Sequence, residues 1–381
     1  MTERSIYDLD KISLPTSPSP GGICFRNPGR MHKRTTNSRE ACPAFHVMSR
    51  VAGGQMLFED TDKEAFRALM WRMARFSGVE ILTYCIMDNH FHMLVRIPER
   101  DKFLRRFASQ EPGDEGERKL LEHLSLLYSK AYITQLESEI LELREHGRED
   151  HVQKVLERYK GRLCNLSAFV KEVKERFSRW FNKRHGRKGT LWADRFKSLL
   201  VQPGSCLRTM AAYIDLNPVR AGLVEQPESY RWCGYSEALA GSKRMRRGLC
   251  RAVGWPIDNW ELPGKRAGRR EQSAAEVYRE VLFEAGMERE GDQQRRKKRQ
   301  GIRLEAAKKV IESGGELTTG ELLTHRVRWF SEGLALGSED YLRETLGSEF
   351  NPDAFRALPV SSGADAPPWY SLSRLRGKGL G

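Results

Sequence analysis

The chain has 381 residues and a formal net charge of +14. The length predicts two or three domains, and the positive charge favours a polyanionic partner, with nucleic acid ahead of an anionic membrane surface. No stretch reaches the ~18 apolar residues of a membrane span, the N-terminus lacks the apolar run of a secretory signal, and the seven cysteines include no C-x-x-C pair. This composition excludes a disulfide framework and a zinc knuckle, and it predicts a cytoplasmic protein.

The first part of the chain alternates between strand-like and helix-like stretches after an N-terminal arm. Residues 1–41 are rich in Pro, Ser, Gly and Arg, which predicts a flexible basic arm. The elements expected next are a strand over 44–50, a helix over 62–77 and strands over 79–87 and 90–97. Gly78 ends the helix, and Asp88-Asn89 forms the turn between the last two strands.

The strand over 90–97 places two histidines on one face. Because side chains alternate with a period of two, His90 and His92 share one face, and Phe91 and Met93 share the opposite, apolar face. Imidazole is the commonest transition-metal ligand, so the pair is a candidate half of an active site. Two solvated polar residues are the alternative interpretation of a His-x-His strand.

The chain changes character from residue 101. Dense charge with leucines at helical spacing predicts an inserted helical hairpin or short coiled coil over 101–160, with a structural or partner-binding role. An amphipathic helix over 163–184 leads into a loop over 182–192 with four cations, two glycines and a terminal tryptophan. Backbone amides beside fixed cations suit phosphate contacts, and Trp192 can stack a base. A solvated loop is the alternative.

A fourth strand over 196–201 and a helix beginning at Ser205 complete the core pattern. The helix is expected to stop at Asn217, because the residue before a proline is disfavoured in the helical region. Tyr213 and Asn217 are one turn apart, on a flank beside the buried stripe. The β-α-β-β-α-β order predicts an α+β fold with a ferredoxin-like (RRM-like) antiparallel sheet and packed helices.

The C-terminal part of the chain is basic and mostly helical by its pattern. Helices are expected over 274–285 and 304–312, with two short helices within 317–346. Residues 237–357 are interpreted as a DNA-binding region, and residues 358–381 as a disordered tail.

The candidate side chains define a chemistry. Two imidazoles and one amide oxygen can hold a Mg²⁺- or Mn²⁺-like ion with open positions. Such an ion polarises a phosphodiester, and a tyrosine can attack the phosphorus to form a covalent phosphotyrosine. The ester keeps the energy of the broken bond, so a second strand's hydroxyl can rejoin it. The resulting chemistry is strand transfer and not hydrolysis.

Four segments carry a resemblance to a known family. They are FHVMSR at 45–50, MDNHFHMLV at 87–95, HGRKGTLWADRFKS at 185–198 and YIDLNPVRAG at 213–222. In this order, over about residues 43–236, they resemble IS200-type Y1 transposases with the HUH motif, and more closely the REP-associated tyrosine transposase branch. The resemblance does not cover the role of the helical insertion or the C-terminal third.

The resemblance implies roles for individual residues. The family's His-hydrophobic-His motif falls on His90 and His92 as metal ligands, its nucleophile on Tyr213, and its third ligand on Asn217, where Gln is common. Some relatives carry a tyrosine at the position of Phe196. The implied cofactor is Mg²⁺ or Mn²⁺. The candidate DNA-contacting residues, taken from the 182–192 loop and the matching motifs, are Lys183, Arg184, Arg187, Lys188, Trp192, Arg195, Lys197 and Arg220.

The function that the resemblance implies is that of a transposase with its catalytic domain over 42–236. It would bind single-stranded, hairpin (REP-like) DNA and cleave and rejoin it through a 5′-phosphotyrosine, without a membrane or small-molecule partner. The alternative is a domesticated hairpin-binding protein on the same fold that does not cut. A relaxase-like nickase shares the histidine pair but usually has another order of motifs. Family members often work as dimers and REP-associated ones also as monomers, so a homodimer stays open.

Overall fold

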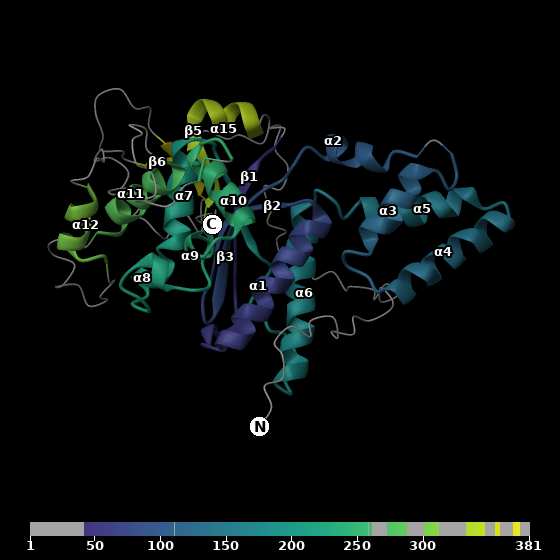
Figure 1. Cartoon of the computed structure of the whole chain (residues 1–381), viewed down its shortest axis with the longest axis horizontal. Helices are drawn as coiled ribbons and strands as arrows, with labels where there is room; N and C mark the ends of the chain where they lie inside the picture. Colours follow the sequence, from purple (N-terminus) through teal and green to yellow (C-terminus); the bar gives the residue numbers. More distant parts are fainter. Residues whose placement is uncertain are drawn as a thin grey trace, which may run out of the picture. The chain divides into compact units, whose positions relative to one another are not determined.

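The computed structural model describes residues 42–109, 111–257, 259–260, 273–287, 301–311, 333–346, 355–358 and 369–373 (Figure 1). They belong to two compact units. The helical unit contains Leu69–Gly78 and Arg100–Gly189, and the sheet unit contains the described residues of Arg34–Ala68, Val79–Glu99 and Thr190–Gly381. Helix α1 (Asp60–Ser77) begins in the sheet unit and ends in the helical unit.

A seven-stranded sheet with the order β2-β3-β1-β4-β5-β7-β6 is the centre of the sheet unit. Neighbours among its first four strands are antiparallel, namely β2 (Glu80–Ile86), β3 (His90–Arg96), β1 (Ala44–Arg50) and β4 (Lys197–Val201). In the register, Met48 of β1 lies opposite His92 of β3. In this four-stranded part, β1 and β3 are the central strands and β2 and β4 flank them. This is the strand order of a ferredoxin-like fold, which confirms the predicted fold class.

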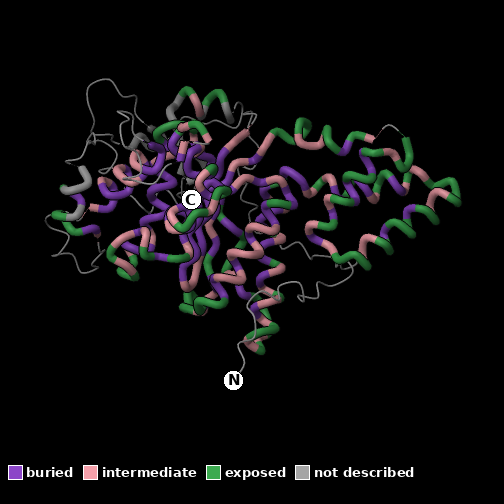
Figure 2. The backbone as a smooth tube through the Cα atoms, viewed as in Figure 1, coloured by how far each residue is buried: buried purple, intermediate pink, exposed green. Residues whose placement is uncertain are grey.

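The four core strands are buried on both faces (Figure 2). On the apolar face of β3, Phe91 and Met93 are fully buried, as the alternation predicts. The histidine face is covered as well, because helix α7 (Ser205–Asp215) contacts β2, β3 and β4. The two imidazoles therefore lie between a strand and a helix, and they do not project from an open sheet surface.

Three C-terminal strands extend the sheet beyond β4. Strand β5 (Gly333–Ser338) pairs in parallel with β4, β7 (Trp369–Ser373) pairs with β5, and β6 (Phe355–Leu358) pairs with β7. The expected helix pair within 317–346 is wrong over β5, whereas α15 (Glu339–Leu346) is helical; residues 317–332 lie outside the described residues. The periodicity of a short apolar run does not distinguish a strand from a helix. This run forms a strand because the edge of β4 offers backbone groups with which it can pair. Strand β7 falls within the stretch 358–381, for which we expected a disordered tail.

Several short helices complete the sheet unit. They are η2 (Ala52–Gly54), α8 (Asn217–Arg220), η4 (Pro227–Ser229), α9 (Gly234–Leu239), α10 (Lys243–Val253), α11 (Ala274–Gly286) and α12 (Leu304–Ile311). Helix α10 contacts β2 closely because Gly248 has no side chain; a Cβ there would lie 2.6 Å from the carbonyl oxygen of Ile81. Helix α11 begins with a Ser273–Glu276 capping box and contacts α7. Parts of the predicted 237–357 region are thus packed on the elements that carry the candidate site.

The helical unit consists of the end of α1 and of further helices within 100–184. They are α2 (Arg100–Leu104), η3 (Arg105–Phe107), α3 (Glu115–Leu124), α4 (Lys130–Glu145), α5 (Glu149–Lys160) and α6 (Leu166–Arg184). The insertion is helical, as predicted, but α3, α4 and α5 make it more than a two-helix hairpin. Leu120, Leu136 and Leu156 supply one buried residue from each of these helices. Among the described residues, no helix combines the length and the apolar character needed to span a membrane.

Candidate active site

The two predicted metal ligands lie on the face of β3 that α7 covers. His90 is half-buried, and His92 has only 2% of its surface exposed. Their ring centroids are 5.1 Å apart, and the ring planes are nearly perpendicular at 85°. The period of two thus brings the two imidazoles together, as the sequence predicts.

Helix α7 brings Tyr213 to these histidines. The ring centroid of Tyr213 lies 5.8 Å from that of His92, and the rings meet edge to face. Only 3% of Tyr213 is exposed. The prediction that Tyr213 lies beside the buried stripe of its helix is therefore wrong, because its ring packs on the imidazoles. The predicted meeting of the tyrosine with the histidine pair is present within one chain and within the sheet unit.

A third histidine, His46, completes what we call the histidine cluster, which consists of His46, His90, His92 and Tyr213. His46 comes from β1, has 2% of its surface exposed and stacks on His92 with a centroid distance of 5.1 Å. It also meets the ring of Tyr213 at 6.0 Å. Sequence reasoning gave His46 no role. The available signal was a polar residue in the otherwise apolar strand over 44–50.

Hydrogen bonds at Nδ1 fix the orientation of the His90 and His92 rings. The Nδ1 atom of His90 lies 2.6 Å from Oδ1 of Asn89, whose own amide donates to the carbonyl of Gly54. The Nδ1 atom of His92 lies 2.8 Å from Nε2 of His46. The Nε2 atoms of His90 and His92 make no hydrogen bond with the described part of the chain. They are therefore the ring atoms through which this pair can bind a ligand.

Burial keeps both imidazoles neutral at pH 7. It lowers the pKa of His90 to about 4, with a further contribution from the nearby positive charge of Arg50. Burial also lowers the pKa of His92 well below its usual value, and the neighbouring histidines act in the same direction. A divalent cation requires deprotonated imidazole, so these two donors fit the predicted Mg²⁺ or Mn²⁺ site. Among the described residues, no group of three His, Cys, Asp or Glu side chains forms a metal site.

Asn217, the predicted third ligand, lies just beyond the helix of the tyrosine. Helix α7 ends at Asp215, and Asn217 begins the short helix α8. Its side-chain amide donates to the carbonyls of Tyr213 at 2.9 Å and Ile214 at 3.2 Å. This contact uses Nδ2 and not Oδ1, and the role of Oδ1 as third ligand stays a prediction.

Four of the predicted DNA-contacting cations belong to the helical unit. Lys183 and Arg184 lie in the last turn of α6, and Lys188 follows in the loop; all three are exposed. Arg187 is half-buried and lies over the ring of Phe181 at 5.8 Å. The loop is closed by the Asn182 side chain, which donates to the carbonyl of Gly189. The result is an ordered turn that presents three exposed positive charges.

The other predicted DNA contacts belong to the sheet unit. Arg195 and Lys197 are exposed. Trp192 is half-buried, and its ring packs against Phe58, Phe66 and Phe91 at centroid distances of 5.9, 6.2 and 5.5 Å. The guanidinium carbon of Arg220 lies 5.6 Å from the ring centroid of Tyr213, and its Nη2 lies 3.4 Å from the carbonyl oxygen of Ala285. Arg220 is thus the predicted cation that lies beside the candidate nucleophile.

A comparison with protein families gives a match in the region that carries the histidine cluster. Residues 43–107 and 118–217 match the family described as "Transposase IS200 like". The matched residues include the whole histidine cluster and Asn217. The match covers less than half of the chain, and it agrees with the resemblance of the four sequence motifs.

Similarity of the chain to individual proteins is more distant. No curated protein matches the chain. A solved structure titled "Structure of the REP associates tyrosine transposase bound to a REP hairpin" is similar at 16% sequence identity and a TM-score of 0.34. The match covers 64% of this chain and 98% of that one.

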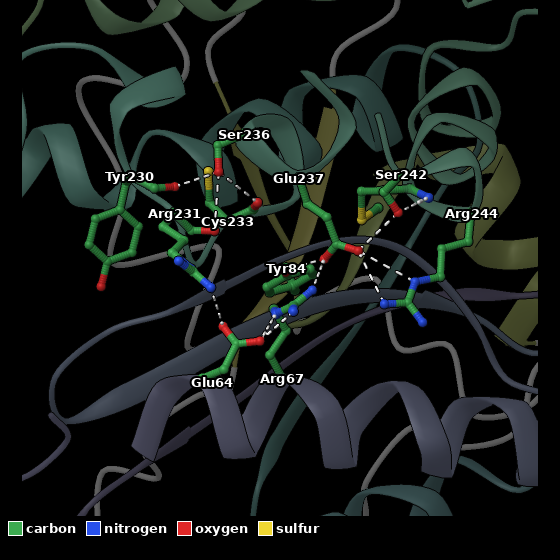
Figure 3. Close-up of polar contacts among 11 residues, drawn as sticks. Glu64, Arg67, Tyr84, Tyr230, Arg231, Cys233, Ser236, Glu237, Ser242 and Arg244 are labelled. Atoms are coloured by element: carbon green, nitrogen blue, oxygen red, sulfur yellow. Dashed lines mark hydrogen bonds and ion pairs between the residues drawn. The ribbon is translucent and has the colours of Figure 1, made fainter. Parts of the chain in front are cut away.

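The sheet unit contains a second polar group, the carboxylate cluster, which consists of Asp215, Glu237 and their donors. Asp215 is fully buried and accepts hydrogen bonds from the hydroxyls of Thr83 and Tyr278 and from the backbone N–H of Tyr235. Burial raises the pKa of Asp215 to about 6. Figure 3 shows the second half of the cluster, in which Glu237 accepts from Tyr84 and Ser242 and pairs with Arg67 and Arg244.

Proposed function

We propose that this protein is a DNA strand transferase that uses Tyr213 as its nucleophile and a divalent cation, Mg²⁺ or Mn²⁺, bound through His90 and His92. The observation that supports the proposal best is the contact of the Tyr213 ring with His92 in a single chain. A nucleophile must lie beside the group that activates the phosphodiester, and this contact provides that proximity.

The proposed reaction consists of two balanced displacements. The phenolate oxygen of Tyr213 attacks the phosphorus, the bond from phosphorus to the 3′-oxygen breaks, and that oxygen takes up a proton. The product is a 5′-phosphotyrosine, from which the 3′-hydroxyl of another strand displaces the tyrosine. A bound divalent cation would polarise the phosphodiester and offset the charge gained in the transition state. Asn217 would supply a third ligand through Oδ1.

Arg220 has a role in this scheme because its guanidinium lies beside the nucleophile. A positive charge near a phenol favours the phenolate, which is the attacking form. The Ala285 carbonyl contacts the guanidinium, so helix α11 from the C-terminal region helps to place this charge. The same cation can also attract the phosphate that reacts.

The proposed substrate is single-stranded DNA with a REP-like hairpin. This part of the proposal rests on the resemblance of four sequence motifs to REP-associated transposases and on the net charge of +14. The exposed cations Lys183, Arg184, Lys188, Arg195 and Lys197 would contact phosphates. Because the nucleophile and both histidines come from one chain, cleavage does not require residues to be exchanged between copies.

The decisive experiment incubates the protein with labelled hairpin oligonucleotides taken from the DNA that flanks its gene, with and without Mn²⁺. A denaturing gel should show a covalent protein–DNA adduct that depends on Mn²⁺. Tyr213→Phe should abolish the adduct, whereas the matched control Tyr132→Phe in the helical unit should retain it. An unchanged adduct in Tyr213→Phe would move the nucleophile elsewhere. Salt-dependent hairpin binding without any adduct would instead favour a non-cleaving DNA-binding protein.

A further inference from the structure

His46 contacts both halves of the proposed catalytic apparatus. Its Nε2 atom lies 2.8 Å from Nδ1 of His92, and its ring meets that of Tyr213 at a centroid distance of 6.0 Å. The stack of the two imidazoles is nearly parallel, with 13° between their planes. Adjacent strands hold both residues, since β1 and β3 pair along their whole length. His46 is therefore fixed relative to the proposed ligand by backbone hydrogen bonds as well as by its ring.

A hydrogen bond between two neutral imidazoles has two forms, and they differ in what His92 can bind. In the first form, Nδ1–H of His92 donates to Nε2 of His46, and the other ring nitrogen of His92 carries a lone pair. In the second form, Nε2–H of His46 donates to Nδ1 of His92, and the other nitrogen of His92 carries a proton. Only the first form can bind a cation through Nε2 of His92.

We infer that His46 is a positioning residue, whose Nε2 accepts the Nδ1 proton of His92 and so holds His92 in the tautomer that can bind a metal ion. The inference rests on the proposed function, because it assigns His92 to the metal site. His90 provides a parallel within the same cluster, since the side-chain Oδ1 of Asn89 is the acceptor at its Nδ1. Both proposed ligands would thus have the outer partner that metal-binding histidines usually have.

The first test measures Mn²⁺ binding by the loss of the free-ion EPR signal, with no DNA present. His46→Phe keeps a ring of similar size but removes the acceptor, so it should weaken Mn²⁺ binding by about 10- to 100-fold. His46→Gln keeps an acceptor near the position of Nε2 and should bind Mn²⁺ within about 3-fold of the wild type. His151→Gln, at a half-buried histidine of the helical unit, should bind like the wild type. Circular dichroism shows whether each variant is folded.

Two results of this test would overturn the inference. One is that folded His46→Phe binds Mn²⁺ with the affinity of the wild type. The other is an equal loss in His46→Phe and His46→Gln, which would mean that ring shape and not the acceptor matters. If His46→Phe does not fold, the His46→Gln result and the second measurement decide.

The second measurement is the tautomer of His92 in the metal-free protein, by NMR of ¹⁵N-labelled histidine. The wild type should carry its proton on Nδ1, and His46→Phe should shift it toward Nε2. A proton on Nε2 of His92 in the wild type would contradict the inference whatever the metal does. If the wild type and His92→Ala bind Mn²⁺ equally, the proposed metal site fails, and the NMR result still decides the role of His46.

Discussion

Helix α7 contributes one residue to each of two polar clusters, and the clusters differ in how completely the protein satisfies their hydrogen bonds. Tyr213 belongs to the histidine cluster, and Asp215, two residues later, belongs to the carboxylate cluster. In the carboxylate cluster, Asp215 accepts from two hydroxyls and a backbone amide, and Glu237 is held by two arginines and two hydroxyls. In the histidine cluster, the Nδ1 atoms of His90 and His92 have partners within the described chain, but the Nε2 atoms do not.

This difference separates a structural role from a functional one. A buried group whose hydrogen bonds are complete stabilises one conformation and has nothing left with which to bind a ligand. A buried imidazole with a free lone pair has a donor available for chemistry. Asp215 therefore has the contacts of a structural residue, whereas the histidine pair keeps the ring nitrogens through which the proposed metal ion would bind.

The largest effect on stability is expected for Asp215→Ala. The substitution leaves the hydroxyls of Thr83 and Tyr278 and the amide of Tyr235 without their acceptor, which should lower the free energy of unfolding by about 3 kcal/mol. Urea unfolding followed by circular dichroism measures the change. Glu225→Gln, at an exposed ion pair with Arg303, is the control and should change stability by less than about 0.5 kcal/mol. Equal stability of the two variants would contradict the structural role of Asp215.

The two clusters should give pH dependences of opposite sign. The pKa of Asp215 is raised from 3.8 to about 6, so between these values the folded state binds more protons than the unfolded state, and acidification stabilises the fold. The pKa of His90 is lowered from 6.5 to about 4, so in that window the unfolded state binds more protons, and acidification destabilises the fold. Each contribution is on the order of 2 kcal/mol.

Unfolding free energies between pH 7.5 and 4.5 would separate the two contributions. We expect His90→Gln to lose less stability than the wild type as the pH falls, and Asp215→Asn to lose more. Shifts of the same sign in both variants would show that one of the two groups is misassigned.

The smallest expected effect is that of Thr83→Val. The substitution keeps the shape of the side chain and removes one of the donors to Asp215, while Tyr278 and Tyr235 still donate. The expected loss of unfolding free energy is about 1 kcal/mol. Adduct formation by Tyr213 should continue, because the histidine cluster is intact. A loss of the adduct in a folded Thr83→Val protein would mean that the two clusters are coupled through α7.

Much of the fold over residues 43–217 could be predicted from the sequence, because its elements have strong periodicity. The strands at 44–50 and 90–97 and the helix beginning at Ser205 are present within one or two residues. The meeting of Tyr213 with the histidine pair was also expected. The environment of Trp192 could not be predicted, because its ring packs against three phenylalanines and no local pattern indicates this contact. The pairing of strand β5 could not be predicted either, because its partner β4 is more than 130 residues away in the chain.

The sequence by itself determined the order of the elements, the shared face of His90 and His92 and the resemblance of the motifs, because these are local properties with a period of two or 3.6 residues. Only the tertiary structure decided that His46 stacks on His92 and that Tyr213 is buried against both. The physical reason is that a periodic pattern states which face a side chain occupies. It does not state which distant strand or helix covers that face, and strand pairing and helix packing between distant segments settle that contact.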